Sequence, residues 1–226
     1  MVDEPIAFPN GTAALGDIFA LLAGPTAPLR YRAGDWPAPA FTPFGGPKPP
    51  YAVLHVGARS PLRHWEPARW ADVADRLART GLEVVLTAGP GEHGLAGAID
   101  PGARYKSYAG LLDLPQMWHL IAGARLMVTL DTGIAHLAKL TGTPTVCIFG
   151  PGSAPLLGRG EFWQAAPFAA ASVADFPCRD QAFLFKRRLQ WVRHCARSSS
   201  ECPRARCMEA VTPEDVLGAI PSGLAG

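Results

Sequence analysis

Short apolar runs alternate with amphipathic segments through the middle of the chain. Residues 51–56 and 82–87 are apolar runs of the length of a buried strand. Between them, residues 67–80 are predicted to form an amphipathic helix, and Gly81 suits its end. Apolar side chains recur along this helix at helical spacing: Trp70, Val73, Ala74 and Leu77. The pattern therefore predicts a strand, a helix and a second strand in succession.

The same alternation continues toward the centre of the sequence. Residues 114–122 predict a helix with Pro115 in its first turn. Residues 125–129 and 143–149 predict two further strands, and Cys147 is expected to lie in the core. Strands that alternate with helices through short loops indicate a parallel sheet with right-handed crossovers. We therefore predict an α/β fold, a Rossmann-like parallel sheet with helices on both faces.

The two ends of the chain have a different character. Residues 1–50 are rich in glycine and proline, with one helical stretch over residues 12–23, and are predicted to be a linker or the remnant of an N-terminal domain. Residues 51–175 are predicted to be the ligand-binding domain. Residues 176–226 are predicted to be a loop-rich, cysteine-bearing extension that packs on that domain and ends in a short helix over residues 212–220.

Composition and charge narrow the class of protein. The 21 basic and 19 acidic residues give a net charge of +2, which argues against a broad nucleic-acid surface. No apolar run approaches the ~20 residues that a membrane-spanning helix needs, and the first residues lack the pattern of a signal peptide. We therefore expect a cytoplasmic protein, not a transmembrane one, whose five cysteines are thiols or metal ligands.

Three polar loops follow three of the predicted strands. They contain, in order, Ser60, Arg63 and His64; Gly89, Gly91 and Glu92; and Asp131, Thr132, Gly133 and His136. In a parallel sheet such loops converge on one edge. The helix that follows Asp131 begins with amides that have no partner inside the helix, so they can hold a phosphate. The sequence therefore predicts a nucleotide site at this edge.

Each candidate residue also has an ordinary structural interpretation. Arg63 can bind two phosphate oxygens at once, or it can be a solvated surface arginine. Glu92 can accept hydrogen bonds from ribose hydroxyls, or it can begin a helix. His136 can donate to a phosphate or act as an acid, or it can be a buried core residue. Asp131 can cap the helix or contact the ligand.

A separate candidate site lies in the C-terminal extension. Cytosolic thiols grouped in this way can bind zinc or iron. The residues are Cys178, Cys195, Cys202 and Cys207, with His194 nearby. Their spacing matches no standard zinc finger. The alternative is a loop with reduced, buried thiols, so a structural metal is a prediction with an open alternative.

Taken together, these segments resemble the C-terminal half of the heptosyltransferases of glycosyltransferase family 9. The resemblance rests on HVGARSPLRHW, on VVLTAGPGE and on the long segment YAGLLDLPQMWHLIAGARLMVTLDTGIAHLAKLTGTPTVCIFGP. The tail C-x4-CM followed by VTPEDV is also similar to the ending of that family. The resemblance covers roughly residues 51–220.

The resemblance implies a GT-B architecture, in which two Rossmann-like domains face each other across a cleft. The C-terminal domain would bind the nucleotide sugar, with Thr132, Gly133 and His136 at the diphosphate and the adjoining sugar. Arg63 stands where the family usually has lysine, and it would neutralise the leaving phosphate; with His136 it would be catalytic. Glu92 would contact the nucleoside. Ser60, Gly89 and Asp131 complete the implied donor site.

The implied reaction is transfer of heptose or a related sugar from an ADP-sugar to a lipopolysaccharide-type or other glycan acceptor. No cofactor or metal is required for the transfer. In the family the N-terminal domain supplies a carboxylate base, and residues 1–50 cannot build that domain. A partner chain is therefore expected to supply the acceptor half, with the protein peripheral at the inner membrane. The alternatives are a non-catalytic nucleotide-sugar-binding module and a metal-binding interaction protein.

Overall fold

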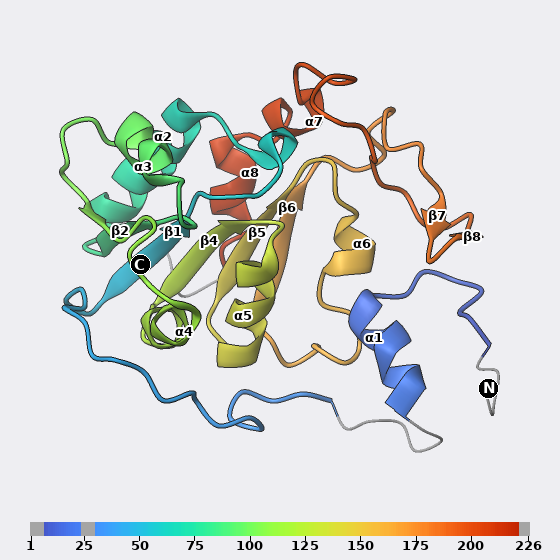
Figure 1. The fold of residues 1–226 in the computed structure, drawn as a ribbon, viewed down its shortest axis with the longest axis horizontal. Coiled ribbons are helices and arrows are strands. Elements are labelled where there is room, and N and C mark those ends of the chain that lie inside the picture. Colours follow the sequence, from blue (N-terminus) through green and yellow to red (C-terminus); the bar gives the residue numbers. More distant parts are fainter. Residues whose placement is uncertain (1–6, 24–29, 222–226) are drawn as a thin grey trace.

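A six-stranded parallel sheet forms the centre of the protein (Figure 1). The computed structural model describes residues 7–23 and 30–221. The strands are β1 (Tyr51–His55), β2 (Glu83–Thr87), β3 (Lys106–Ser107), β4 (Leu126–Leu130), β5 (Thr145–Phe149) and β6 (Phe168–Ser172). Every neighbouring pair in the sheet is parallel. The predicted α/β fold is therefore confirmed.

The strands lie in the order β3-β2-β1-β4-β5-β6. The chain runs outward from β1 to β3, then returns to the centre and runs outward again from β4 to β6. This order reverses between β1 and β4, so their connections leave in opposite directions. In open parallel sheets such a reversal leaves a crevice at the carboxyl ends of the two strands, where ligands bind. The topology thus marks the loops after β1 and β4.

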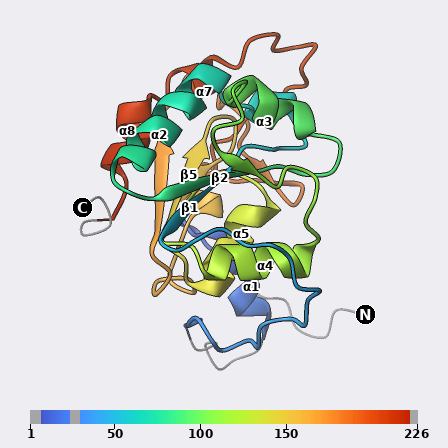
Figure 2. The same ribbon diagram turned by 90° about the vertical axis from the view of Figure 1, so that its left-hand side faces the viewer.

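Helices cover both faces of the sheet (Figure 2). On one face lie α2 (Pro67–Arg79), α3 (His93–Ile99) and α8 (Pro213–Gly218), and on the other lie α4 (Leu114–Ala122) and α5 (Gly133–Thr141). Successive strand side chains point to opposite faces. Leu54 therefore packs in the cluster that contains Trp70 of α2, whereas Val53 packs in the cluster that contains Leu120 of α4. Both layers have a dry apolar core.

The predicted boundaries differ from the observed ones by one to three residues at most strands and helices. The expected helix over residues 12–23 is divided into α1 (Leu15–Ala20) and a 3-10 turn (Leu21–Ala23). Three elements of the sheet layer were not predicted, namely β3, α3 and β6. Among residues 7–23 and 30–221, no helix combines the length and the apolar character needed to cross a membrane. The predicted extents of residues 1–50 and 176–226 fall partly outside the described residues.

The remaining elements are short and lie around the carboxyl edge of the sheet. They are a 3-10 turn (Pro61–Arg63), α6 (Ala154–Leu157), the antiparallel strands β7 (Phe183–Leu184) and β8 (Arg187–Arg188), and α7 (Arg206–Glu209). Segments around β7 and α7 have little regular structure, as the predicted loop-rich extension implied.

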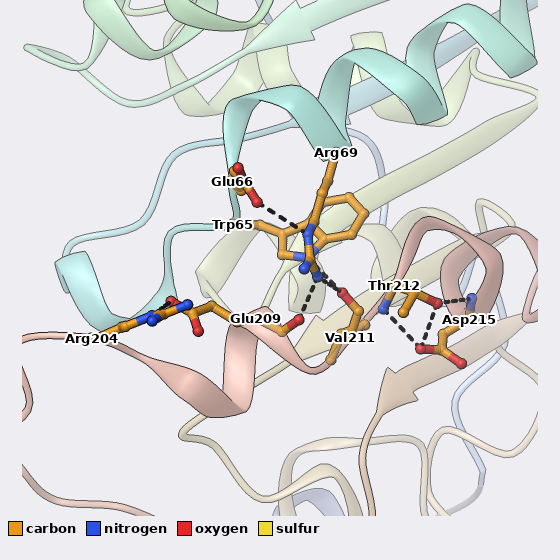
Figure 3. Close-up of polar contacts among 8 residues, drawn as sticks. All are labelled: Trp65, Glu66, Arg69, Arg204, Glu209, Val211, Thr212 and Asp215. Atoms are coloured by element: carbon orange, nitrogen blue, oxygen red, sulfur yellow. Dashed lines mark hydrogen bonds and ion pairs between the residues drawn. The ribbon is translucent and has the colours of Figure 1, made fainter.

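Hydrogen bonds tie the C-terminal segment to the start of α2 (Figure 3). The indole Nε1 of Trp65 donates to the carbonyl of Val211 at 3.0 Å. The Arg69 guanidinium donates to the carbonyls of Glu209 and Val211, both at 2.5 Å, and lies 3.3 Å from the Glu66 carboxylate. Because the Trp65 indole and the Arg69 guanidinium satisfy carbonyls in an irregular segment, they fix that segment onto the sheet domain.

Candidate functional site

Three loops meet at the crevice that the strand order predicts. A cavity of about 520 Å³ opens there. Its lining residues are Gly57, Ala58 and Arg59 after β1; Gly89, Pro90 and Glu92 after β2; Thr132, Gly133 and Ile134 after β4; and His55 and Leu114. The structure thus brings together four of the predicted residues, Gly89, Glu92, Thr132 and Gly133. We call this the edge cavity.

The Glu92 carboxylate joins two of these loops. It accepts a hydrogen bond from the amide of Ala58 at 3.1 Å and one from the amide of Gly89 at 2.7 Å. A Cβ at Gly57 would lie 2.1 Å from a Glu92 oxygen, and a Cβ at Gly89 would lie 2.8 Å from it. A side chain at either position would displace the Glu92 carboxylate, and one at Gly57 would also crowd the amide nitrogen of Gly89, 3.0 Å away. Glu92 holds the cavity walls in register, a role that sequence reasoning did not anticipate.

The loop after β4 leaves polar atoms without partners. Thr132 is the N-cap residue of α5, yet its side chain makes no capping hydrogen bond. Among the described residues, Thr132 Oγ1 and Asp131 Oδ2 are buried without a hydrogen-bond partner. The first turn of α5 carries no acidic residue. Buried polar atoms without partners are costly. The Thr132 hydroxyl can donate to a bound anion, whereas the Asp131 carboxylate can only accept a hydrogen bond when it is ionised.

Arg63 lies beside this helix end. Its Nη1 donates to the carbonyl of Asp131 at 2.5 Å, and its Nη2 is 3.8 Å from Asp131 Oδ2. Burial raises the pKa of the Asp131 carboxyl, and the cations of Arg63 and Lys139 oppose that rise. The Arg63 side chain remains 38% exposed. The guanidinium therefore remains accessible to an anion other than Asp131.

His136 faces a different cavity. It lines an apolar space of about 560 Å³ between α1, α5 and α6, together with Phe19, Lys139 and Leu157. Burial, and then the charge of Lys139, lower the pKa of His136 to about 4. The imidazole is thus neutral near pH 7, which suits a hydrogen-bond donor better than a general acid. Its predicted contact with a diphosphate stays a prediction.

Ser60 lies at a third cavity, of about 310 Å³, which Arg63 also lines. Residues of the C-terminal extension, including Phe185 and Arg197, close its other side. The predicted donor residues are therefore distributed over three neighbouring cavities, and Arg63 contacts the turn that joins them. This division could not be predicted from the sequence, because the side chains diverge after the loops have converged.

His55 is a residue of the edge cavity that sequence reasoning missed. It ends β1, and its Nδ1 lies 3.0 Å from Thr87 Oγ1. Complete burial lowers its pKa to about 4. A histidine within the apolar run YAVLHV was the available signal. Leu114 was also missed, although a large apolar side chain that is 61% exposed at the start of α4 marks a surface able to contact a flat ring.

The cysteines of the extension are thiols in this structure. Burial, and then the neighbouring Cys178 and Cys195, raise the pKa of Cys207 to about 11. Cys202 Sγ instead donates to the carbonyl of Arg204 at 3.3 Å. Within the part of the chain that the structure describes, no three His, Cys, Asp or Glu side chains are arranged to hold a metal. As they lie, the four thiols do not fit a metal centre. Cys147 is buried in β5, as predicted.

The curated proteins that match this chain in sequence include lipopolysaccharide heptosyltransferases. Lipopolysaccharide heptosyltransferase 1 of Pseudomonas aeruginosa is 32% identical over 147 residues, which are 63% of this chain and 41% of the relative. Lipopolysaccharide heptosyltransferase 3 of Escherichia coli is 32% identical over 136 residues, which are 58% of this chain and 40% of the relative. The chain thus spans about two fifths of the length of these curated relatives.

Solved structures show the same fold. E. coli ADP-heptose LPS heptosyltransferase II matches with a TM-score of 0.54 at 22% identity, over 75% of this chain and 45% of that one. The dodecameric iron-containing heptosyltransferase TibC in complex with ADP-D-β-D-heptose also matches with a TM-score of 0.54, at 20% identity, over 82% of this chain and 47% of that one.

A family model provides the assignment. The model described as glycosyltransferase family 9 (heptosyltransferase) matches residues 33–160, more than half of the chain. The match includes the loops after β1, β2 and β4, and so the whole edge cavity. The chain therefore belongs to glycosyltransferase family 9.

Proposed function

We propose that this chain binds an ADP-sugar in the edge cavity and takes part in transferring heptose, or a related sugar, to a hydroxyl of a lipopolysaccharide-type acceptor. The curated relatives that it matches are lipopolysaccharide heptosyltransferases. The observation that carries the proposal is the open amino end of α5, where Thr132 Oγ1 is buried without a hydrogen-bond partner among the described residues and Arg63 lies beside the turn.

The diphosphate of the donor would lie at the amino end of α5. The helix dipole and the first free amides favour negative charge there. Arg63 would supply a fixed cation that stabilises the charge developing on the leaving diphosphate, the kind of electrostatic effect that often contributes most to catalysis. The adenosine would occupy the edge cavity, whose volume of about 520 Å³ is within the usual range for such ligands. There Leu114 and Ile134 offer apolar contacts to the base.

The acceptor half of the reaction needs a second contribution. In our proposal, the acceptor-binding domain and its catalytic carboxylate come from outside residues 1–226, in a partner chain or a longer protein. We place the activity in the cytoplasm, peripheral to the inner membrane, where a lipid-linked acceptor is accessible. The alternative is a non-catalytic nucleotide-sugar-binding module, which the open donor site fits equally well.

Titration calorimetry with ADP tests the donor site. We expect ADP to bind, and we expect UDP and CDP to bind less tightly because their smaller bases would make less contact with Leu114 and Ile134. An Arg63→Ala/His136→Ala double variant should lose affinity, and the two single variants show which side chain contributes. Wild-type affinity in the double variant would exclude this site.

Sugar-transfer assays test the reaction itself. Turnover by the chain alone would show that no second contribution is needed. Turnover only after a family 9 acceptor domain is added would support the two-part proposal. ADP binding without turnover in either case would favour the non-catalytic alternative.

The cysteine segment supports a separate and narrower proposal. In this proposal a rearrangement that brings Cys178, Cys195, Cys202 and Cys207 together would create a zinc or iron site. Elemental analysis of protein purified without chelators is the test. One zinc or iron per chain that is lost in a Cys178→Ser/Cys195→Ser variant would support the site, and a metal-free protein would overturn it.

A further inference from the structure

An exposed hairpin projects from the C-terminal extension. The strands β7 and β8 form a two-stranded antiparallel sheet of their own. The side chains of Phe183 and Phe185 are 54% and 55% exposed. Lys186, Arg187 and Arg188 beside them are exposed as well. We call residues 183–188 the basic hairpin.

The turn of the basic hairpin has an unusual composition. Phe185 has φ +49° and Lys186 has φ +63°, so both central residues lie in the left-handed region. A two-residue hairpin turn with this geometry favours Asn-Gly or a similar pair, because bulky side chains are strained at positive φ. The chain nevertheless places a phenyl ring and a cation at the tip. A strained residue in an exposed turn points to a role outside folding.

The segment around the basic hairpin carries basic residues without acidic ones. From Gln181 to Ser200 the sequence contains no Asp or Glu. None of the ion pairs among the described residues involves Lys186, Arg187, Arg188 or Arg193. By contrast, seven other arginines of the described chain are paired with carboxylates: Arg30, Arg63, Arg69, Arg76, Arg104, Arg197 and Arg204. The hairpin therefore carries a concentration of cations that the protein itself does not neutralise.

The apolar surface continues from the hairpin tip to α1. The ring of Phe185 lies 6.4 Å from the ring of Phe8 and 6.1 Å from the ring of Phe19. Phe19 and Leu22 are themselves 50% and 64% exposed. Figure 1 shows α1 and the hairpin on the same side of the molecule. Exposed apolar residues that are bordered by cations mark a binding surface.

We propose that the basic hairpin, with the neighbouring face of α1, docks the protein on an anionic lipid bilayer. The phenyl rings would enter the interfacial region while the cations contact lipid phosphates. Two observations favour a lipid over a nucleic-acid partner. The aliphatic Leu22 side chain beside the phenyl rings suits contact with acyl chains better than stacking on bases. The net charge of the whole chain is only +2, which is low for a nucleic-acid-binding protein. The docking rests on the proposed function in one respect, because a lipid-linked acceptor gives the enzyme a reason to be at the membrane.

Vesicle co-sedimentation tests this surface. The protein should bind vesicles of phosphatidylcholine mixed with phosphatidylglycerol, bind pure phosphatidylcholine poorly, and be released by salt. An Arg187→Ser/Arg188→Ser variant should bind about 30-fold more weakly, since each basic residue near an anionic surface contributes about fivefold. The matched control is Lys48→Ser/Arg79→Ser. It removes two exposed cations that precede β1 and β2, at the amino edge of the sheet, and it should change binding less than about twofold.

A second variant separates docking from folding. Phe185→Asn/Lys186→Gly installs the pair that this turn prefers, so the hairpin should be at least as stable. It removes one ring and one cation, so vesicle binding should fall about tenfold or more. Retained binding in this variant, or equal losses in the hairpin variant and its control, would overturn the proposal. Loss of binding to a labelled oligonucleotide but not to vesicles would assign the surface to nucleic acid instead.

ADP titration of the same proteins keeps the two proposals apart. Arg187 and Arg188 line neither the edge cavity nor the cavities of Ser60 and His136, so ADP affinity should be unchanged in the Arg187→Ser/Arg188→Ser variant. Phe185 lines the cavity shared by Ser60 and Arg63, so its variant is compared by vesicle binding alone. If the wild-type chain fails to bind ADP while its vesicle binding depends on the hairpin, the donor site is wrong and the docking surface stands. If ADP binds and vesicles do not, the docking surface is wrong and the donor site stands.

Discussion

Two helices in this protein begin at a threonine, and they begin in opposite ways. Thr132 before α5 and Thr212 before α8 are both N-cap residues with extended backbones. The Thr212 hydroxyl accepts from the amide of Asp215 at 3.1 Å, and the Asp215 carboxylate accepts from the amide of Thr212 at 2.8 Å (Figure 3). Thr132 makes no capping bond, and its Oγ1 is buried without a partner among the described residues.

The difference lies in the first turn of each helix. Thr212 is followed by Pro213, Glu214 and Asp215, so carboxylates neutralise the positive end of α8. Gly133 opens α5, and no acidic residue follows in its first turn. One helix end is closed because its task is to fix the C-terminal segment. The other is open, as our proposal of a diphosphate site at α5 requires.

The largest expected effect comes from closing the open end artificially. Gly133→Glu places an acidic residue in the first turn of α5, as in α8. A Cβ at Gly133 meets no atom within 4 Å, so the side chain fits. The helix should gain about 0.5–1 kcal/mol. ADP affinity should fall at least about 100-fold, since two anions about 4 Å apart repel by about 4 kcal/mol at a partly screened site. Calorimetry and urea unfolding measure the two effects.

Gly133→Gln is the matched control, because it has the same shape without the charge. It should keep most of the ADP affinity. If Gln weakens binding as much as Glu does, the loss is steric and the open end is not an anion site. If neither variant changes ADP affinity, the ligand lies elsewhere.

The dependence of the free energy of unfolding on pH below 7 tests whether His55 is buried at the edge cavity. Burial holds the pKa of His55 at about 4, below its unfolded value of about 6.5. Between these values the unfolded chain binds more protons, so stability rises with pH across this window and falls on acidification. The full effect of one such group is on the order of 3 kcal/mol.

Urea unfolding at a series of pH values measures this effect. Between pH 6.5 and 5, His55→Gln should reduce the slope by up to about 1.4 kcal/mol per pH unit. His136→Gln is the matched case, because burial also lowers the pKa of His136 to about 4. An unchanged slope in both variants would show that neither imidazole is buried as the structure has it.

Two arginines near the start of α2 differ in the same way: we assign Arg63 to ligand binding and Arg69 to the stability of the fold. Arg63 donates to the Asp131 carbonyl and stays partly exposed, whereas Arg69 satisfies the carbonyls of Glu209 and Val211. Arg63→Ala should weaken ADP binding by about 10- to 100-fold with little change in stability, because a charged hydrogen bond contributes about 1.5–3 kcal/mol. Arg69→Ala should lower the free energy of unfolding by a similar amount and leave ADP affinity unchanged. Reversal of these two outcomes would contradict the assignment of roles.

Sequence patterns could predict the sheet because apolar runs and helical spacing are local. They identified the four central strands, α2 and α4 to within a few residues, and they predicted that a helix follows Asp131, where α5 lies. They missed β6, whose sequence FAAAS lacks the β-branched residues typical of strands, and α3, whose glycines obscure a helix. The pairing of β7 with β8 was also missed, because Phe-Lys is not a recognisable hairpin turn.

The convergence of the loops at the site could be predicted from the sequence, but the orientation of their side chains could not. That the loops after β1, β2 and β4 converge follows from parallel strands. Which way a side chain turns after the loop does not follow. Glu92 turns inward to two amides, and His136 turns to the cavity beside α1. Arg63 and Arg69 have opposite roles although they are six positions apart. Orientation depends on packing partners that are distant in sequence.

The smallest effect, and the most direct test, compares the two threonines by the same substitution. Valine has the shape of threonine without the hydroxyl. At Thr212 it should cost about 0.5–2 kcal/mol of stability, because a working cap is lost. At Thr132 no capping bond exists to lose, and a buried unpaired oxygen is removed, so stability should stay the same or rise by about 1 kcal/mol.

Ligand binding should change in the opposite sense in these two variants. Thr132→Val should weaken ADP binding by about five- to tenfold, the worth of a single hydrogen bond to a phosphate or ribose oxygen, while Thr212→Val should leave it unchanged. Urea unfolding measures the free energy of unfolding of each variant, and calorimetry measures its affinity for ADP. A Thr132→Val protein that is less stable and binds ADP normally would mean that its hydroxyl serves the fold. A variant that is more stable and binds poorly would mean that the protein gives up stability at α5 to keep a place for its ligand.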